Sequence, residues 1–307
     1  MDWRSEIEAA AMRITGHARV TPTLTTSGFG LAAPVEMKLE QLQHTGSFKA
    51  RGAFNTLLAA PVPSAGLVAA SGGNHGAAVG YAAAQLGHKA AIFVPELAGP
   101  AKIALIQRTG ADLRVVPGTY AEAFAQAQTY EADTGAGQVH AYDTPSTVAG
   151  QGTLMREWED QGLQADTILI AVGGGGLIAG SLAWLDGRRK VVAVEPESCA
   201  TLTTARAQGA PVDVDVSGVA ANALGARKIG QICFDLAQHH NTECVTVTDA
   251  AIIAAQTALW QDARLLVEPA GAAALAALMS GAYTPDPDER IAILVCGANP
   301  APDPLGS

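Results

Sequence analysis

Charged residues, aromatic residues and cysteines are scarce in this chain of 307 residues. Only 16% of the residues are charged, 5% are aromatic, and six are lysines. The four cysteines, at positions 199, 233, 244 and 296, lie far apart without the spacing of a zinc site, which favours reduced thiols. Lysine and arginine number 19 against 29 acidic residues, a net charge of -10. This balance argues against nucleic acid or an anionic membrane as a partner, because either requires a basic face.

Long apolar runs are also missing. No stretch of about 18 uncharged apolar residues is available to span a bilayer. The first six residues, MDWRSE, carry acids where a secretion signal would be apolar, so we expect a cytoplasmic protein. Hydrophobic residues still make up 49% of the chain, enough for a substantial core. One large domain and two lobes are both compatible with this length.

Apolar strand-like runs alternate with helix-length segments, a pattern typical of βαβ units and of mainly parallel sheets with helices on both faces. We predict strands at 34–39, 67–70, 90–94, 113–116, 167–172, 190–195 and 291–295, and helices at 5–15, 51–60, 120–133, 249–262 and 268–279. Further helices are predicted to end at 87 and 110 and to begin at 177. The Pro-Val-Pro sequence at 61–63 marks a junction between lobes. We therefore predict a small inserted domain over residues 65–142 and a large domain formed by 1–64 and 143–307. The region 205–230 gives no readable pattern.

Lys49 lies between a glycine-containing loop and the start of a predicted helix, in the segment TGSFKARGA at 45–53. The positive end of a helix dipole disfavours an ammonium, so the amine there is easier to use as a nucleophile. Schiff-base chemistry requires such an amine. A surface lysine without a function fits the same local sequence.

Four consecutive glycines, Gly173–Gly176, follow a predicted strand and precede a helix that starts at Leu177. Each costs about 0.5–1 kcal/mol relative to alanine in backbone entropy, so bare backbone is needed there. Successive N–H groups at a helix N-terminus form an anion site, which favours a phosphate over a mere tight turn. Glu195 follows Gly176 by 19 residues, which leaves a nicotinamide-dependent oxidoreductase as a weaker alternative.

A second strand-to-helix junction carries Ser71-Gly72-Gly73-Asn74-His75, where hydroxyl, amide and imidazole groups stand beside flexible backbone. These groups could hold a carboxylate. Alternatively, Asn74 caps the following helix and His75 is solvated. Cys296 ends the last predicted strand and is by default a small buried apolar residue.

Five motifs, in order and spacing, resemble the threonine/serine dehydratase family, pyridoxal-phosphate enzymes of fold type II that include serine racemase. They are TGSFKxRGA around Lys49, SGGNH at 71–75, GQGT at 150–153, the tetraglycine loop and CGAN at 296–299. The resemblance covers residues 20 to 300. It implies a two-domain α/β fold similar to the β subunit of tryptophan synthase, pyridoxal 5′-phosphate as cofactor and, by analogy alone, a homodimer.

The resemblance also implies roles for individual residues. Lys49 is implied to be the catalytic Schiff-base lysine. The implied cofactor contacts are Phe48, Lys49, Asn74 at the pyridoxal O3′, Gly173, Gly174, Gly175, Gly176 and Leu177 at the phosphate, Glu268, and Cys296 facing the pyridine nitrogen. Ser71, Gly72, Asn74 and His75 are implied to hold the substrate carboxylate. A neutral Cys296 makes the cofactor a weaker electron sink, which favours prompt loss of a β-substituent over a long-lived carbanion.

The chain departs from the family at three points. Racemases carry a serine at the position of Gly72, so we expect poor racemase activity. Relatives that are activated by a cation use a Glu, a backbone carbonyl and an Asp; Glu195 and the Cys199 carbonyl match, but Thr201 replaces the Asp. We therefore assign no metal site. About ten residues follow Cys296, so we expect no regulatory domain and no feedback control by isoleucine.

The resemblance implies a dehydratase, an ammonia-lyase that acts on a small amino acid such as L-threonine or L-serine and gives a 2-oxo acid and ammonia. Lys49 would remove the Cα proton, and either the cofactor phosphate or Lys49 would protonate the leaving hydroxyl. Tyr142, in a segment near the substrate in relatives, leaves a β-aryl serine or a hydroxyaspartate open as substrate. β-Replacement, as in cysteine or threonine synthase, is disfavoured because those families usually carry Lys-Asp-Arg where this chain has Lys-Ala-Arg at 49–51. A non-catalytic nucleotide-binding protein is the alternative from another class.

Overall fold

The computed structural model describes residues 1–299, which fold into two α/β parts. The strands are β1 (Thr23–Thr26), β2 (Val35–Leu39), β3 (Leu67–Ala70), β4 (Ala90–Pro95), β5 (Asp112–Val116), β6 (Gly137–Gln138), β7 (Thr167–Ala171), β8 (Lys190–Pro196), β9 (Glu243–Val247) and β10 (Ile291–Val295). The α-helices are α1 (Trp3–Arg13), α2 (Lys49–Ala59), α3 (Asn74–Gln85), α4 (Pro100–Gln107), α5 (Tyr120–Thr134), α6 (Pro145–Asp160), α7 (Gly176–Leu185), α8 (Thr201–Gln208), α9 (Ala221–Leu224), α10 (Gln231–His239), α11 (Asp249–Ala263) and α12 (Pro269–Met279). Short 3₁₀ turns are η1 (Glu40–Leu42), η2 (His44–Gly46), η3 (Glu96–Ala98) and η4 (Glu197–Cys199).

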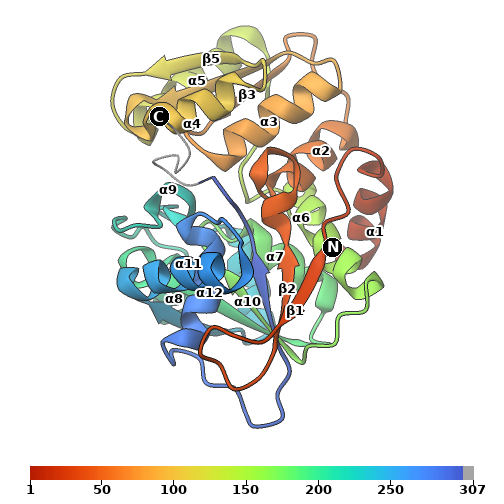
Figure 1. Cartoon of the computed structure of the whole chain (residues 1–307). Helices are drawn as coiled ribbons and strands as arrows, with labels where there is room; N and C mark the ends of the chain where they lie inside the picture. Colours follow the sequence, from red (N-terminus) through yellow and green to blue (C-terminus); the bar gives the residue numbers. More distant parts are fainter. Residues whose placement is uncertain (300–307) are drawn as a thin grey trace.

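Two sheets organise these elements. The larger sheet has the order β1-β2-β10-β7-β8-β9, and the smaller has the order β5-β4-β3-β6. All neighbouring strands are parallel except β1 and β2. In Figure 1 the small sheet and its helices form the upper part of the molecule, and the large sheet lies below with helices on both faces. The predicted α/β class with mainly parallel sheets is confirmed.

Burial explains why the central strands are apolar throughout. Every residue of β3, β7 and β10 is buried, as expected for parallel strands covered on both faces. Helix α7 is buried over its whole length and carries no charged residue, so it is an interior helix. Its N-terminus therefore meets the strand ends deep inside the protein.

Helix α2 packs on α3 of the small part and on α6 of the large part, where the two parts meet (Figure 1). Glycines allow this close approach. A Cβ on Gly150 would lie 2.7 Å from the Cα of Gly52, and one on Gly152 would lie 2.9 Å from the carbonyl oxygen of Gly180. The GQGT motif at 150–153 is thus a helix-packing motif, and it lies in helix α6, which is absent from the predicted elements.

The predicted boundaries at 67–70 and 291–295 match β3 and β10. Helix α2 begins at Lys49, two residues before the predicted start at 51, so Lys49 occupies its first turn. The unreadable region 205–230 holds the end of α8, the short α9 and irregular backbone. Among the described residues, no helix is both long and apolar enough to cross a membrane.

Candidate active site

The residues singled out in the sequence converge where parallel strands end. Lys49 follows β2, Cys296 follows β10 and the tetraglycine loop follows β7, all in the large sheet, whereas the loop 71–75 follows β3 of the small sheet. Carboxyl ends of parallel strands are where open α/β sheets bind ligands. The topology therefore gathers chemistry that is spread over about 250 residues of sequence.

Lys49 is held in place from both sides. The backbone N–H of Phe48 donates to the Cys296 carbonyl at 3.2 Å, and Ser47 forms an antiparallel bridge with Gly297. The Lys49 ammonium donates to the carbonyl oxygen of Ala141 at 2.7 Å and lies 5.3 Å from the Phe48 ring centre. These contacts fix the amine at the junction of the two parts.

The pKa of the Lys49 amine is lowered from 10.5 to about 8. Burial is the main cause, because removal from water disfavours the ammonium, and the nearby Cys296 and Glu268 partly oppose it. The prediction that this amine is easy to deprotonate agrees with the direction of the shift. The cause differs from the predicted one. The sequence suggested the helix N-terminus as the cause, whereas in the structure desolvation lowers the pKa and outweighs the opposing charges.

Glu268 and Asn74 form the second half of the site. Glu268, the residue before α12, is buried, and its Oε1 accepts a hydrogen bond from Asn74 Nδ2 at 2.5 Å. Burial raises the pKa of Glu268 to about 7, opposed by Lys102, Asn74 and Lys49. The carboxyl group presses so closely on Gly297 that a Cβ there would collide with Oε1.

Asn74 does not cap its helix, which corrects one interpretation of the loop. It is the first residue of α3, Gly73 precedes it, and its Oδ1 accepts from Asn299 Nδ2 at 2.6 Å. His75 is not solvated either, because it is only 7% exposed and its Nε2 lies 2.8 Å from the Val139 carbonyl. Burial lowers its pKa to about 3, with a smaller effect of Lys49, so the imidazole is neutral.

Cys296 is 3% exposed and has no disulfide partner. Burial, aided by the charge of Glu268, raises the pKa of the thiol far above its ordinary value. It is therefore a neutral thiol, able to act as a hydrogen-bond partner but not as a counter-charge. Near it, the hydroxyl of Ser47 is buried and has no partner within residues 1–299.

The tetraglycine loop offers a set of unused donors. Within the described chain, no acceptor is found for the N–H groups of Gly173 to Leu177, although the loop carbonyls are engaged. The carbonyl of Gly173 accepts from Thr201 Oγ1 at 2.7 Å, and that of Gly174 accepts from Gly230 N at 3.1 Å. Successive free N–H groups at the buried N-terminus of α7 fit a phosphate.

The family model described as "Pyridoxal-phosphate dependent enzyme" matches residues 14–297. The chain belongs to this family. Pyridoxal phosphate is its cofactor, and the fold is the fold type II arrangement that the sequence motifs implied.

Individual relatives agree with this membership. Phenylserine dehydratase of Ralstonia pickettii is 34% identical over 96% of this chain and 92% of its own length. The biosynthetic L-threonine dehydratase of Escherichia coli is 35% identical over 86% of this chain, which spans only 52% of that relative. Serine racemase from maize superposes with a TM-score of 0.90 at 27% identity, covering 96% of this chain and 93% of the racemase.

The described residues fit the cofactor of the family. The free N–H groups after β7 suit its phosphate, the amine of Lys49 suits its aldehyde, and the neutral thiol of Cys296 suits an unprotonated ring nitrogen. The unpartnered Ser47 hydroxyl adds a further donor beside Lys49. Among residues 1–299, none of the site side chains named above conflicts with binding of pyridoxal phosphate.

Gly72 lies in a space that excludes a side chain. A Cβ there would stand 2.6 Å from the Cβ of Ala98, which follows β4. A serine like that of the racemases would therefore require the loop 71–75 or Ala98 to shift. The expectation of poor racemase activity remains a prediction with a steric reason added.

Glu195 and Thr201 lie next to the phosphate loop. Glu195 is buried, and its two oxygens accept from the N–H groups of Leu202 and Thr203 and from the Thr203 hydroxyl at 2.6–2.8 Å. Thr201 Oγ1 lies 3.2 Å from Glu195 and donates to the Gly173 carbonyl. Protein donors thus already satisfy the Glu195 carboxylate, and the assignment of no metal site remains a prediction.

Two residues of the site, one beside the tetraglycine loop and one beside Gly73, were missed or only hinted at in the sequence. The Tyr142 ring lies over the loop, with Cγ 2.5 Å from the position of a Cβ on Gly174. Lys102 is almost completely buried, and the charges of Lys102 and Glu268 act on each other's pKa. The sequence feature that could have pointed to Lys102 is that it is the single charged residue of the apolar segment PAKIALIQ, which forms helix α4.

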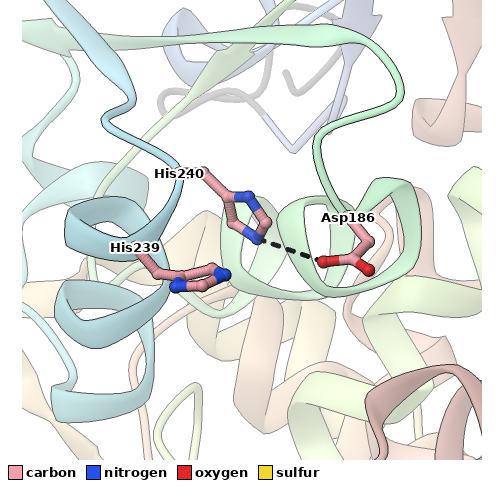
Figure 2. Close-up of side chains that lie close together, drawn as sticks. All are labelled: Asp186, His239 and His240. Carbon is pink, nitrogen blue, oxygen red and sulfur yellow. Dashed lines mark ion pairs between the residues drawn. The ribbon is translucent and has the colours of Figure 1, made fainter.

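Three other side chains could hold a metal ion, away from this site. Asp186, His239 and His240, at the C-terminal ends of α7 and α10, each offer a ligand atom, and these atoms lie within 4.8 Å of one another. Figure 2 shows the His240 ring pointing toward the Asp186 carboxylate, with His239 beside them. The His240 Nε2 to Asp186 Oδ1 distance is 3.9 Å. Asp186 and His239 are exposed, and the adjacent hollow is lined by Arg189, Lys190 and Arg206, which oppose a cation.

Proposed function

We propose that this chain is a pyridoxal-phosphate-dependent dehydratase that converts a 3-hydroxy amino acid, such as L-threonine or L-serine, into a 2-oxo acid and ammonia. The observation that carries the proposal is the buried Lys49 amine, with a pKa lowered to about 8, at a junction that also holds a phosphate loop. Relatives named phenylserine dehydratase and L-threonine dehydratase support the same lyase chemistry.

The residues of the site divide the work. The N–H groups of Gly173 to Leu177 would hold the cofactor phosphate, Asn74 would bind its O3′, and Cys296 would face its ring nitrogen. When bound, the cofactor supplies the electron sink that makes the Cα proton acidic. The loop 71–75 would hold the substrate carboxylate and so orient Cα toward Lys49.

Lys49 would take the Cα proton as general base. The electron pair of the broken C–H bond forms the Cα–Cβ double bond, the Cβ–O bond breaks, and the hydroxyl leaves as water after protonation. The released enamine then hydrolyses to a 2-oxo acid and ammonia. Because Gly72 offers no side chain to the opposite face of Cα, elimination is favoured over racemisation.

A β-aryl serine is a second candidate substrate. The phenylserine dehydratase relative aligns over 96% of this chain, and the Tyr142 ring stands beside the phosphate loop where an aryl group would find an aromatic neighbour. A panel of L-threonine, L-serine, 3-phenylserine and 3-hydroxyaspartate, scored for 2-oxo acid, ranks the candidates.

The decisive variant is Lys49→Ala. It should lose both the absorbance of the lysine-bound cofactor and all turnover, because the bond to the cofactor and the removal of the Cα proton both need the Lys49 amine. A Lys49→Arg variant controls for the loss of charge and should be equally inactive. Full production of 2-oxo acid by Lys49→Ala would refute the assignment.

We also propose, on the family resemblance, that the protein is a cytoplasmic homodimer with an inserted domain over residues 65–142. Sedimentation of the purified holoenzyme gives the assembly state. A monomer at micromolar concentration would contradict the dimer.

A further inference from the structure

Within residues 1–299, Lys102 is a buried cation with an incomplete set of partners. It is 3% exposed, and among these residues its ammonium donates one hydrogen bond, to the backbone carbonyl of Asn222 at 3.0 Å. No ion pair joins it to a carboxylate of residues 1–299. An ammonium has three donors, and burial without compensation is costly, so two of its N–H groups call for an acceptor.

The position of this ammonium is set by both parts of the molecule. Lys102 comes from α4 of the small part, whereas Asn222 belongs to α9 of the large part. A Cβ built on Gly73 would lie 3.4 Å from Lys102 Nζ and 3.5 Å from the Asn222 carbonyl oxygen. The amine therefore stands directly beside the loop 71–75.

The balance of charges beside Gly73 favours the binding of an anion next to Lys102. Glu268 is the acid whose field acts on Lys102, but Asn74 already donates to its Oε1 at 2.5 Å. Lys49 adds a second amine to the same region. A bound carboxylate next to Gly73 would give Lys102 a direct counter-charge and an acceptor for its free N–H groups.

We propose that Lys102 binds the α-carboxylate of the amino-acid substrate from the Gly73 side of the loop 71–75. In the bound state the ammonium would bridge the carboxylate and the Asn222 carbonyl, so that substrate ties the small part to the large part across α4 and α9. The inference rests on the proposed function, since it assumes an amino-acid substrate in this site.

The test compares ligand binding to holoenzyme variants, using the best 3-hydroxy amino acid of the panel and its carboxamide. Binding is followed by the rapid absorbance change of the cofactor just after mixing, before turnover depletes the ligand. In Lys102→Met the dissociation constant of the amino acid should rise about tenfold or more, whereas that of the uncharged amide should change less than about twofold. The turnover number at saturating substrate should fall less than the affinity does.

Matched variants separate charge from structure. Lys102→Arg keeps the cation and should retain most of the preference for acid over amide, and Lys102→Gln tests the neutral state if the Met variant fails to fold. Lys89→Met, at an exposed lysine of the small part, should change neither constant. Equal weakening of acid and amide, or no weakening of the acid, would overturn the inference. Wild-type protein that binds the acid but forms no 2-oxo acid would instead refute the proposed function.

Discussion

At the scale of single residues, Glu268 should make the stability of the cofactor-free protein depend on pH. Its pKa is raised from 4.5 to about 7 by burial, so the folded protein holds a proton that the unfolded chain releases. This stabilisation is complete below about pH 4.5 and is lost as the pH rises through about 7. Relative to Glu268→Gln, the wild-type free energy of unfolding should therefore fall by up to about 3 kcal/mol over that interval.

Urea denaturation of both proteins without cofactor, at several pH values across this interval, measures the difference. Glu96→Gln, which changes an exposed acid of the small part, should track the wild type at every pH. A difference between wild type and Glu268→Gln that stays constant with pH would contradict the raised pKa.

Gly72 provides a steric test at the same scale. A Cβ at this position would lie 2.6 Å from Ala98 Cβ, so Gly72→Ser should displace the substrate loop and destabilise the protein by about 1–3 kcal/mol. Ala98→Gly removes the opposing atom, and the double variant should recover most of the loss. Thermal denaturation and kcat/KM report the two effects, and a single variant as stable and active as wild type would contradict the crowding.

Local backbone requirements made some of these residues predictable. Lys49 and the tetraglycine loop can be predicted from the sequence because a few consecutive residues specify each of them. The signals are a loop followed by a helix start around Lys49, and bare backbone in the tetraglycine loop. The bond from Asn74 to Glu268 spans 194 positions, and the contact of Lys102 with Asn222 spans 120. Partners at such separations are set by the packing of whole elements, which a single sequence does not specify.

At the scale of elements, the turn between β7 and α7 depends on the absence of side chains. A Cβ on Gly174 would meet the Tyr142 ring, 2.5 Å from its Cγ. Gly174→Ala should therefore shift the loop and weaken cofactor binding about tenfold or more, because the N–H groups that would face the phosphate lose their alignment.

Tyr142→Ala removes the obstructing ring and should restore much of the affinity when combined with Gly174→Ala. Tyr142→Ala alone is the matched control for any effect of the ring itself. Titration of the cofactor-free proteins with pyridoxal phosphate, followed by absorbance, gives the four dissociation constants. Additive effects of the two changes would contradict a steric cause.

The elements themselves were predicted where their pattern is simple. Uniformly apolar runs such as β3 and β10 were located correctly, because burial on both faces demands them. Helix α6 was missed since its glycines at 150 and 152 lower helix propensity, and the close contact with α2 and α7 that compensates is tertiary. Strand β9 was missed because it is only half-buried at an edge of the sheet.

At the scale of the whole molecule, the alternation of strands and helices predicted parallel sheets, but not their strand order. The last strand, β10, inserts between β2 and β7, which brings Cys296 beside Lys49. Such an order depends on which faces pack together rather than on adjacency in sequence. The domain boundaries at 64/65 and 142/143 remain predictions. Helix α2 packs on both parts, so a boundary in the sequence need not coincide with a boundary in the hydrophobic core.

A buried ion network joins α2 to β2, η1 and α6. Arg51, two residues after Lys49, pairs with Glu40 at 2.7 Å and with Glu157 at 2.9 Å, and Lys38 pairs with Glu157 at 2.6 Å. The side chains of Arg51 and Glu40 are 2% and 0% exposed. The two cations balance the two acids, so no buried charge is left over while all four are present.

Removal of one member should unbalance the network. Arg51→Met leaves Glu40 buried without its partner and should lower the free energy of unfolding by about 3–5 kcal/mol. It should also weaken cofactor binding, because Arg51 anchors the first turn of α2, which carries Lys49. Arg290→Met, which breaks an exposed pair with Asp166, should lower the stability far less in the same urea titration. If the two variants lost equal stability, burial would not be what gives the network its strength, and the position of Lys49 would have to be fixed by the contacts of Phe48 and Ser47 with the end of β10 alone.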